Sequence, residues 1–372
     1  MLRFGDFSMA TSDATFMQRA IRLAERGRGQ ASPNPPVGAV VVRDGKVIGQ
    51  GYHRGPGTAH AEIEALEAAG EDARGSTLYV TLEPCTHQGR TPPCAPRVIE
   101  AGFARVVIGT TDPNPAVDGR GVAALEEAGI EVETGVRRGE AERLIQTFSK
   151  FIRTKRPFVT AKIAVSLDGR VAAADGSSQW ITGPTARRDA HRMRASADAV
   201  LVGIGTVLRD DPQLRVRLRG YRGRQPLRVV LDSSARTPLD AALLGGEAHS
   251  VVFTTDKATN DAADALRSRG ADVVRVPARE GRVDLAAVLE MLGHRDVTHL
   301  LIEGGPTVLG DTVERGLADR YVFYIAPKLL GSGGPGAVAA LVAPTIADAR
   351  ELRVESVRHI GADLKIEAYP RM

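Results

Sequence analysis

The chain is poor in cysteine and in aromatic residues, and it has no long hydrophobic run. Two cysteines among 372 residues are too few for a disulfide framework and fit a reducing cytosol. An aromatic content of 4% argues against a surface that stacks the bases of single-stranded nucleic acid. No run of about 18 apolar residues occurs, so no membrane span is expected. The opening residues MLRFGDFSMATSDATF lack the apolar core of a secretory signal, and we expect a cytoplasmic protein.

The charge of the chain is close to balanced, with a formal net charge of +4. Basic and acidic residues are interspersed rather than gathered in a tail or stripe, so nucleic acid is not an expected partner. A mild basic excess suits small anionic substrates. At roughly 100–200 residues per domain, this length predicts two domains.

The first half alternates strand-like and helix-like segments. Residues 37–43 and 46–52 are predicted strands joined at Asp44-Gly45, a pair typical of hairpin turns. Further strands are predicted in STLYVTL, ARVVIGT and IEVETG, and helices in HAEIEALEAAG, APRVIEAG and GVAALEEAG. This alternation predicts a three-layer α/β domain, which we place at residues 1–150.

A basic stretch, SKFIRTKRPF, separates the halves, and Lys155, Arg156 and Pro157 interrupt its helical pattern. Strand and helix patterns then resume with FVTAKIAVSLDG. Buried strands are predicted in DAVLVG, LRVVLD, HSVVFTT, ADVVRV and HLLIEGG. We therefore expect a second α/β domain over residues 151–372.

Both cysteines lie in one proline-rich loop, downstream of a His-x-Glu sequence. His60, Cys85 and Cys94 are three residue types that bind zinc, and a catalytic zinc has three protein ligands and one position for water. Glu62 begins a predicted helix beside His60, where its carboxylate could carry a proton between water and a leaving amine. These residues predict a hydrolytic zinc site.

Two other interpretations share these residues. A non-catalytic binding module with a structural zinc ion would need a fourth ligand, for which His87 is a candidate. A nucleic-acid base deaminase with an appended RNA-binding domain would share the zinc chemistry, but its usual motif places two residues between the cysteines. Here eight residues separate Cys85 from Cys94.

The second half contains a possible anion site. Gly304 and Gly305 lie between a predicted strand and a predicted helix, where backbone N–H groups can bind a phosphate or the glycines can serve a tight turn. The sequence is not GxGxxG, so a Rossmann site is not supported. A predicted helix nearby contains Arg187, Arg188, Arg192 and Arg194. Most of these would be solvated, while one could bind an anion. Trp180 is either a core residue or a site residue.

Four segments carry a resemblance to a known family: SPNPPVGAVVV, GYHRGPGTAHAE, YVTLEPCTHQGRTPPC and TDPNPAVDGRG. They resemble the bifunctional deaminase–reductases of riboflavin biosynthesis, in which the loop between the cysteines is long. The resemblance covers most of the first half and continues into the second. It implies a cytidine-deaminase-like three-layer α/β/α domain followed by a dihydrofolate-reductase-like α/β domain.

The resemblance also implies two reactions. A zinc ion, one per chain, would support hydrolytic deamination of 2,5-diamino-6-(5-phosphoribosylamino)pyrimidin-4-one. NADPH would then reduce the ribosyl group to ribityl and give 5-amino-6-(5-phosphoribitylamino)uracil. The expected partner is thus a phosphorylated pyrimidine, and we also expect a homo-oligomer.

Matched positions imply roles for single residues. His60, Cys85 and Cys94 would bind zinc, Glu62 would carry protons, and Lys162 would be a proton donor for the reduction. Nucleotide contacts are implied at Ala164, Trp180, Thr206, Asp210, Ser233 (or its neighbour Ser234), Gly305, Pro306, Thr307, Val308, Leu309, Gly310 and Asp311. Substrate contacts are implied at Asn34, His53, Ser178, Arg194, Leu214, Arg217 and Glu303. From residue type alone, Asn34 reads as a turn residue and His53 as a surface histidine.

Overall fold

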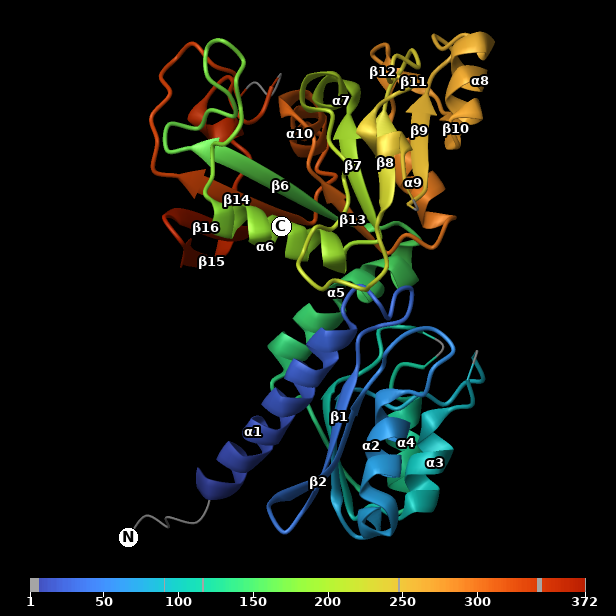
Figure 1. Cartoon of the computed structure of the whole chain (residues 1–372). Coiled ribbons are helices and arrows are strands. Elements are labelled where there is room, and N and C mark those ends of the chain that lie inside the picture. Colours follow the sequence, from blue (N-terminus) through green and yellow to red (C-terminus); the bar gives the residue numbers. More distant parts are fainter. Residues whose placement is uncertain (1–6, 90, 116, 247, 340–342, 372) are drawn as a thin grey trace. The chain divides into compact units, whose positions relative to one another are not determined.

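The chain forms two compact units, residues 1–155 and 156–372, each with its own sheet (Figure 1). The structure is a computed structural model that describes residues 7–371 apart from 90, 116, 247 and 340–342. Residue 150 lies inside helix α5 (Arg138–Thr154), so that helix continues past the expected domain limit. No helix in the described part of the chain is both long and apolar enough to span a bilayer.

The first unit is built on a five-stranded mixed sheet with the order β2-β1-β3-β4-β5. Its strands are β1 (Gly38–Arg43), β2 (Lys46–Tyr52), β3 (Thr77–Leu82), β4 (Arg105–Thr110) and β5 (Glu131–Thr134). Strand β1 is antiparallel to β2 and β3, whereas β3, β4 and β5 run parallel. Parallel strands are expected to be covered on both faces, as they are here.

Helices cover both faces of this sheet and give the three layers that the sequence predicted (Figure 1). They are α1 (Phe7–Ala24), α2 (Ala61–Ala69), α3 (Cys94–Ala101), α4 (Arg120–Glu127) and α5. Alternate residues of β1 face opposite layers: Val41 packs with α2, α3 and α4, and Val40 packs with α1.

The predicted elements of this unit are confirmed, and two helices, α1 and α5, are added. Asp44 and Gly45 turn the hairpin with φ angles of 50° and 71°, which fit the type I′ geometry expected of Asp-Gly. Gly70 ends α2 with a φ of 59°. Helices α1 and α5 were not among the predicted elements.

The second unit is built on a nine-stranded sheet with the order β10-β9-β8-β7-β13-β6-β14-β16-β15. Its strands are β6 (Phe158–Ser166), β7 (Ala199–Gly203), β8 (Leu227–Leu231), β9 (Ser250–Thr254), β10 (Ala271–Arg275), β13 (His299–Ile302), β14 (Arg320–Ala326), β15 (Leu352–Ile360) and β16 (Asp363–Pro370). The run from β10 to β14 is parallel, and β16 and β15 extend it as an antiparallel hairpin. A small ribbon pairs β11 (Ala278–Arg279) with β12 (Arg282–Val283).

Two hydrophobic cores lie on opposite faces of this sheet. Helices α9 (Leu285–Gly293) and α10 (Pro306–Glu314) pack in one core. The other core contains residues of α6 (Pro184–Ser196), α7 (Ile204–Asp210) and α8 (Asn260–Ser268). All the strands that the sequence predicted for this half are present, because their runs of Val, Leu and Ile are buried on both faces.

Helix α2 packs closely onto strand β2 at two glycines, Gly49 and Gly51. A Cβ atom added at Gly49 would lie 2.2 Å from the carbonyl oxygen of Ala65, and one added at Gly51 would lie 2.4 Å from Cβ of Glu64. The absence of a side chain at these two positions therefore allows α2, which carries Glu62, to approach the sheet closely.

We predict that Gly49→Ala lowers the free energy of unfolding of the first unit by about 1–3 kcal/mol, because the added methyl group forces α2 away from β2. Thermal unfolding of the purified variant would measure this. Gly139→Ala is the matched control, since its Cβ would meet only the end of Arg143 at 3.9 Å inside a helix. That control is expected to be neutral or stabilising by up to about 1 kcal/mol. Equal losses in the two variants would contradict the packing argument.

Candidate active sites

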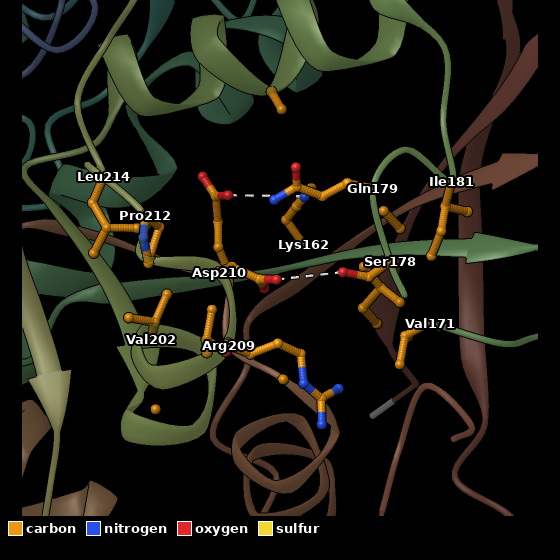
Figure 2. A pocket seen from close by; sticks show the side chains of 18 of the residues that line it. Lys162, Val171, Ser178, Gln179, Ile181, Val202, Arg209, Asp210, Pro212 and Leu214 are labelled. Atoms are coloured by element: carbon orange, nitrogen blue, oxygen red, sulfur yellow. Dashed lines mark hydrogen bonds and ion pairs between the residues drawn. The ribbon is translucent and has the colours of Figure 1, made fainter. Parts of the chain in front are cut away.

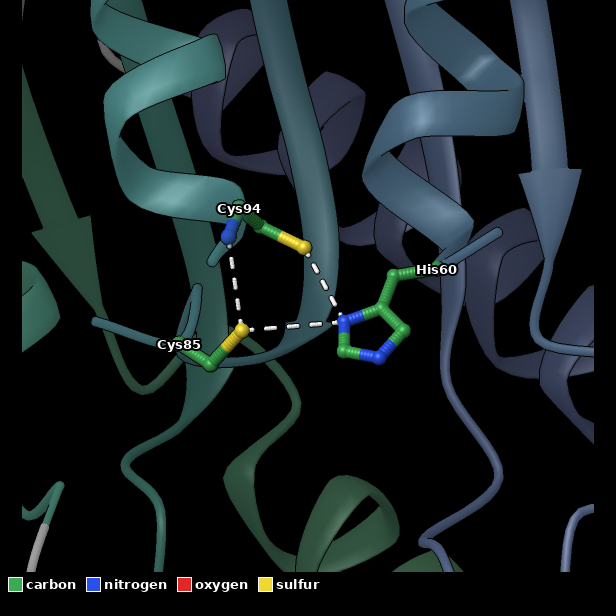
Figure 3. A group of neighbouring side chains, drawn as sticks. All are labelled: His60, Cys85 and Cys94. Atoms are coloured by element: carbon green, nitrogen blue, oxygen red, sulfur yellow. Dashed lines mark hydrogen bonds between the residues drawn. The ribbon is translucent and has the colours of Figure 1, made fainter. Parts of the chain in front are cut away.

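Three possible metal ligands meet where two helices of the first unit begin (Figure 3). His60 directly precedes α2, Cys94 is the first residue of α3, and Cys85 lies in the loop after β3. His60 Nδ1 is 3.0 Å from Cys94 Sγ and 3.6 Å from Cys85 Sγ. All three donor atoms lie within 4.8 Å of one another, so they can reach one ion.

This donor set fits zinc, which prefers imidazole nitrogen and thiolate sulfur. Both cysteines are free thiols. The backbone N–H of Cys94 points at Cys85 Sγ at 3.4 Å. A hydrogen bond from Cys94 lowers the pKa of the Cys85 thiol, so this sulfur is disposed to be a thiolate. His87 is exposed and is not part of the donor group that the described residues form.

Glu62 lies beside this group in the first turn of α2 and is only 4% exposed. Burial raises the pKa of its carboxyl to about 7, and the neighbouring His60 opposes that rise. The carboxyl is not one of the three clustered donors. It is therefore placed to exchange protons next to the ligands without being one of them.

The structure brings Asn34 and His53 to the same site. His53 is 3% exposed, so the surface interpretation of this histidine is wrong. Its Nδ1 lies 3.2 Å from the carbonyl oxygen of Ala59 and its Nε2 lies 3.0 Å from Asn34 Nδ2. The carbonyl can only accept, so Nδ1 donates and Nε2 accepts from Asn34. The His53 ring meets the His60 ring edge-on, with centroids 5.1 Å apart.

Glu83 is a functional candidate that the sequence did not reveal as such. Its carboxylate is buried and accepts hydrogen bonds from four backbone N–H groups around the start of α4. The donors are Asp112 (3.0 Å), Gly119 (3.0 Å), Gly121 (2.7 Å) and Val122 (3.2 Å). Through these bonds Glu83 fixes the chain two residues before Cys85. Its place in the Glu-Pro-Cys sequence is the signal that could have revealed this role.

The second unit contains a cavity of about 800 Å³ around the ends of β6, β7 and β13, a size typical of small-molecule sites (Figure 2). Most of the residues predicted for this half line it. They are Lys162, Ala164, Ser178, Trp180, Arg194, Thr206, Asp210, Leu214, Arg217, Glu303 and the run from Gly305 to Leu309. The starts of α7 and α10 therefore face one shared cavity.

Glu303 forms the centre of an ion-pair network in this cavity. Arg194 donates to it in bidentate fashion, with Nε 2.6 Å from Oε1 and Nη2 3.0 Å from Oε2. Lys162 Nζ lies 3.8 Å from Oε2. Burial opposes ionisation of Glu303, but Arg194 and Lys162 outweigh it and lower the pKa of this carboxyl to about 2. Arg217, by contrast, forms no ion pair with any other residue that the structure describes.

In the wall of the cavity, residues predicted to contact the substrate lie beside residues predicted to contact the nucleotide. Ser178 Oγ donates to Asp210 Oδ1 at 3.4 Å, as Figure 2 shows. Trp180 is 56% exposed, so the interpretation of this residue as part of the core is wrong. The guanidinium of Arg187 lies over its ring, with Cζ 4.4 Å from the centroid, as expected for a cation–π contact.

Three predicted nucleotide contacts do not line this cavity. Ser233 follows β8 and accepts a hydrogen bond from the Val283 N–H at 3.1 Å. Gly310 is buried within α10, and Asp311 lies 3.6 Å from Arg315. Both belong to the second turn of α10, beyond the residues at its start that face the cavity.

The cavity also contains residues that sequence reasoning did not assign. His191 and Arg209 line it, together with Gln179. Burial, together with the charges of Arg194 and Arg217, lowers the pKa of His191 to about 4, so its imidazole is neutral near pH 7. The signal for His191 was its spacing: it lies one helical turn before Arg194.

Comparisons with known proteins agree with this two-part arrangement. Residues 10–110 match the family model described as the cytidine and deoxycytidylate deaminase zinc-binding region. Residues 157–366 match the model of the RibD C-terminal domain. The metal-ligand candidates lie in the first match, and the cavity lies in the second.

Full-length relatives extend these matches. The chain is 43% identical to the riboflavin biosynthesis protein RibD of Aquifex aeolicus, over 95% of this chain and 97% of that protein. Its identity to the Escherichia coli protein of the same name is 42%, with coverages of 95% and 98%. The solved structure of Acinetobacter baumannii RibD superposes with a TM-score of 0.87 at 39% identity, covering 98% of this chain and 100% of that one. A Thermotoga maritima structure described as a diaminohydroxyphosphoribosylaminopyrimidine deaminase/5-amino-6-(5-phosphoribosylamino)uracil reductase gives 0.87 at 38%, with coverages of 97% and 99%. The chain therefore belongs to the family of bifunctional deaminase–reductases of riboflavin biosynthesis.

Proposed function

We propose that the chain converts 2,5-diamino-6-(5-phosphoribosylamino)pyrimidin-4-one into 5-amino-6-(5-phosphoribitylamino)uracil in two steps, deamination and then reduction. The observation that carries this proposal is the meeting of His60, Cys85 and Cys94 beside the buried Glu62, in a chain whose other unit holds a cavity of about 800 Å³. We assign the deamination to residues 1–150 and the reduction to residues 151–372.

In the deaminase, His60, Cys85 and Cys94 would hold one zinc ion. Zinc supplies Lewis acidity, which lowers the pKa of a water molecule from 15.7 to about 7. Glu62 would take a proton from a water molecule whose oxygen bonds to the ring carbon. It would return that proton to the amino group, which leaves as ammonia when the carbon–nitrogen bond breaks. Asn34 and His53 lie beside the donors and orient the pyrimidine.

In the reductase, the cavity would hold NADPH and the phosphorylated intermediate together. Bound NADPH would supply the hydride that C1′ of the ribosyl group receives as its bond to the ring oxygen opens. The ring oxygen takes up a proton, for which Lys162 is the proposed donor. Backbone N–H groups at the start of α10 suit the cofactor phosphates, and Ser178 and Leu214 position the substrate.

Arg194 and Arg217, the two arginines implied to contact the substrate, differ in their ion pairs. Arg194 is neutralised by Glu303, whereas Arg217 has no acidic partner among the described residues. A guanidinium without a partner can bind a phosphate without first breaking an ion pair. We therefore assign the phosphate contact to Arg217 and the support of Glu303 to Arg194.

Three further expectations stay predictions: a homo-oligomeric assembly, a cytoplasmic location, and no nucleic-acid or membrane partner. Light scattering during size-exclusion chromatography would test the first of them.

The mass of the reaction products tests the proposed function. The purified protein, loaded with zinc, should convert the diaminopyrimidine to a product in which oxygen replaces one amino group, with release of ammonia. Adding NADPH should then add two hydrogens. Mass spectrometry of the same reaction with and without NADPH separates the steps, and an unchanged substrate in both would refute the proposal.

We predict that Glu62→Gln keeps about one zinc per chain but lowers the rate of deamination by 10² or more, because the amide cannot carry the proton. Ammonia release and elemental analysis measure the two quantities. Reduction of the deaminated intermediate by the same variant is the internal control and should be unchanged. Ammonia release near the wild-type rate would remove Glu62 from this role.

We predict that Arg217→Gln raises the KM of the phosphorylated intermediate by about tenfold or more, through loss of a charge-assisted hydrogen bond. The KM of NADPH should change much less, and deamination should not change. Initial rates of NADPH oxidation give both constants. An equal rise in both would place Arg217 against the cofactor instead of the substrate phosphate.

A further inference from the structure

Helix α6 presents one continuous face to the reductase cavity. The residues of that face are spaced three or four apart, which places them on one side of a helix. They are Arg187, Ala190, His191 and Arg194. Three of the four have polar side chains, and each of these contacts another part of the cavity wall.

These three side chains hold three separate segments. Arg187 donates to the carbonyl oxygen of Thr182 at 2.7 Å, in the segment that contains Ser178 and Trp180. His191 Nδ1 accepts from the backbone N–H of Arg217 at 3.3 Å. Arg194 donates to the carbonyl oxygen of Arg215 at 3.0 Å and binds Glu303. The position of α6 therefore sets the positions of the substrate-side residues of the cavity.

The opposite face of α6 is fixed to the sheet by one carboxylate. Asp189 Oδ2 accepts from the Tyr324 hydroxyl of β14 at 2.7 Å and from Lys365 Nζ of β16 at 2.8 Å. The Tyr324 side chain is 1% exposed. Asp189 and Lys365 are 15% and 12% exposed, so water screens their ion pair weakly. Met193, one turn further on, also contacts the Tyr324 hydroxyl.

A second bond from the same strand fixes the beginning of the helix. Asp363, which is 2% exposed, accepts from the backbone N–H of Gly183 at 2.8 Å. Asp363 and Lys365 are two residues apart on β16, so their side chains leave the same face of the strand. This strand therefore holds both the start and the middle of α6.

We infer that Asp189 is a positioning residue for reduction: its bonds to Tyr324 and Lys365 fix α6, and α6 in turn aligns the residues that bind the phosphorylated substrate. Asp189 is not a catalytic residue, because it does not line the cavity. The inference rests on the proposed reductase function. It concerns the substrate more than the cofactor: among the cavity-lining residues assigned to NADPH, Trp180 lies in a segment that α6 holds, whereas the others lie on β6, α7 and the start of α10.

The test is Asp189→Asn, which removes the charge but keeps an oxygen that can accept from Tyr324. Lys365 keeps a partner in this variant, because Glu367 lies 3.2 Å from it. We expect the KM of the phosphorylated intermediate to rise about tenfold, since small misplacements of binding groups have large effects. The KM of NADPH should change less than about threefold, and deamination, measured by ammonia release on the same chain, should be unchanged.

A matched control separates positioning from general loss of stability. Asp198 is also a buried aspartate of this unit, 6% exposed, and it accepts from the Thr298 N–H at 2.8 Å and pairs with Arg224. It precedes β7, at the end of the strands opposite the cavity. Asp198→Asn should lower the melting temperature and leave the KM of the intermediate unchanged.

An unchanged KM in Asp189→Asn, or an equal rise in Asp198→Asn, would overturn the inference. If Asp189→Asn does not fold, Tyr324→Phe removes only the buried hydroxyl and carries the same expectation with a smaller rise, and an unchanged KM there would overturn it too. A wild-type chain that deaminates but does not reduce the intermediate would instead refute the proposed function of the second unit.

Discussion

Both sites depend on one geometric constraint, that neighbouring parallel strands end at the same edge of a sheet. In the first unit β3 ends just before Glu83 and Cys85, and the chain returns to start α3 at Cys94. In the second unit β7 and β13 are adjacent, and each leads directly into a helix whose first turn faces the cavity. Such an edge concentrates free backbone N–H groups and the side chains of several loops, which is why ligands of open α/β sheets bind there.

Two buried glutamates, Glu62 and Glu303, have different tasks because their surroundings favour different ionisation states. Burial disfavours the ionised form of both. Glu303 faces Arg194 and Lys162, which keep it ionised, so it acts as a fixed anion that organises cations around the cavity. The neighbours of Glu62 oppose each other, because His60 favours the ionised carboxylate whereas the Cys85 sulfur favours the protonated form, and burial leaves its pKa raised to about 7. The same chemical group is thus a permanent charge in one unit and a proton carrier in the other.

The sequence predicted the strands of the first unit, but β14, β15 and β16 of the second sheet were not among its predictions. It predicted the contacts within the second site less well. Runs of Val, Leu and Ile can only be buried, so they identify central strands in any arrangement. The metal-ligand candidates could be found because the chain has so few thiols. The sequence named Arg187 among four arginines of a predicted helix and passed over His191. It could not say which of these side chains face the cavity, because that depends on how the helix crosses the sheet. The burial of His53 likewise depends on the approach of α2 and the loop before it. Ser233 follows β8, a strand of the same sheet that contributes no residue to the cavity wall, so its nucleotide contact stays a prediction.

The ties between α6 and β16 have a consequence for how the protein is made. Asp189 and Lys365 are 176 residues apart in the chain. During translation α6 leaves the ribosome long before its partner strand β16 has been synthesised. The first unit, by contrast, needs only residues 1–155 to form its internal contacts. Long-range contacts of this kind delay folding, because the intervening chain must be ordered first. A nascent chain therefore has all the residues of the deaminase unit before β16, the strand that holds α6, has been made. The deaminase and reductase activities should mature in the order in which the reaction uses them.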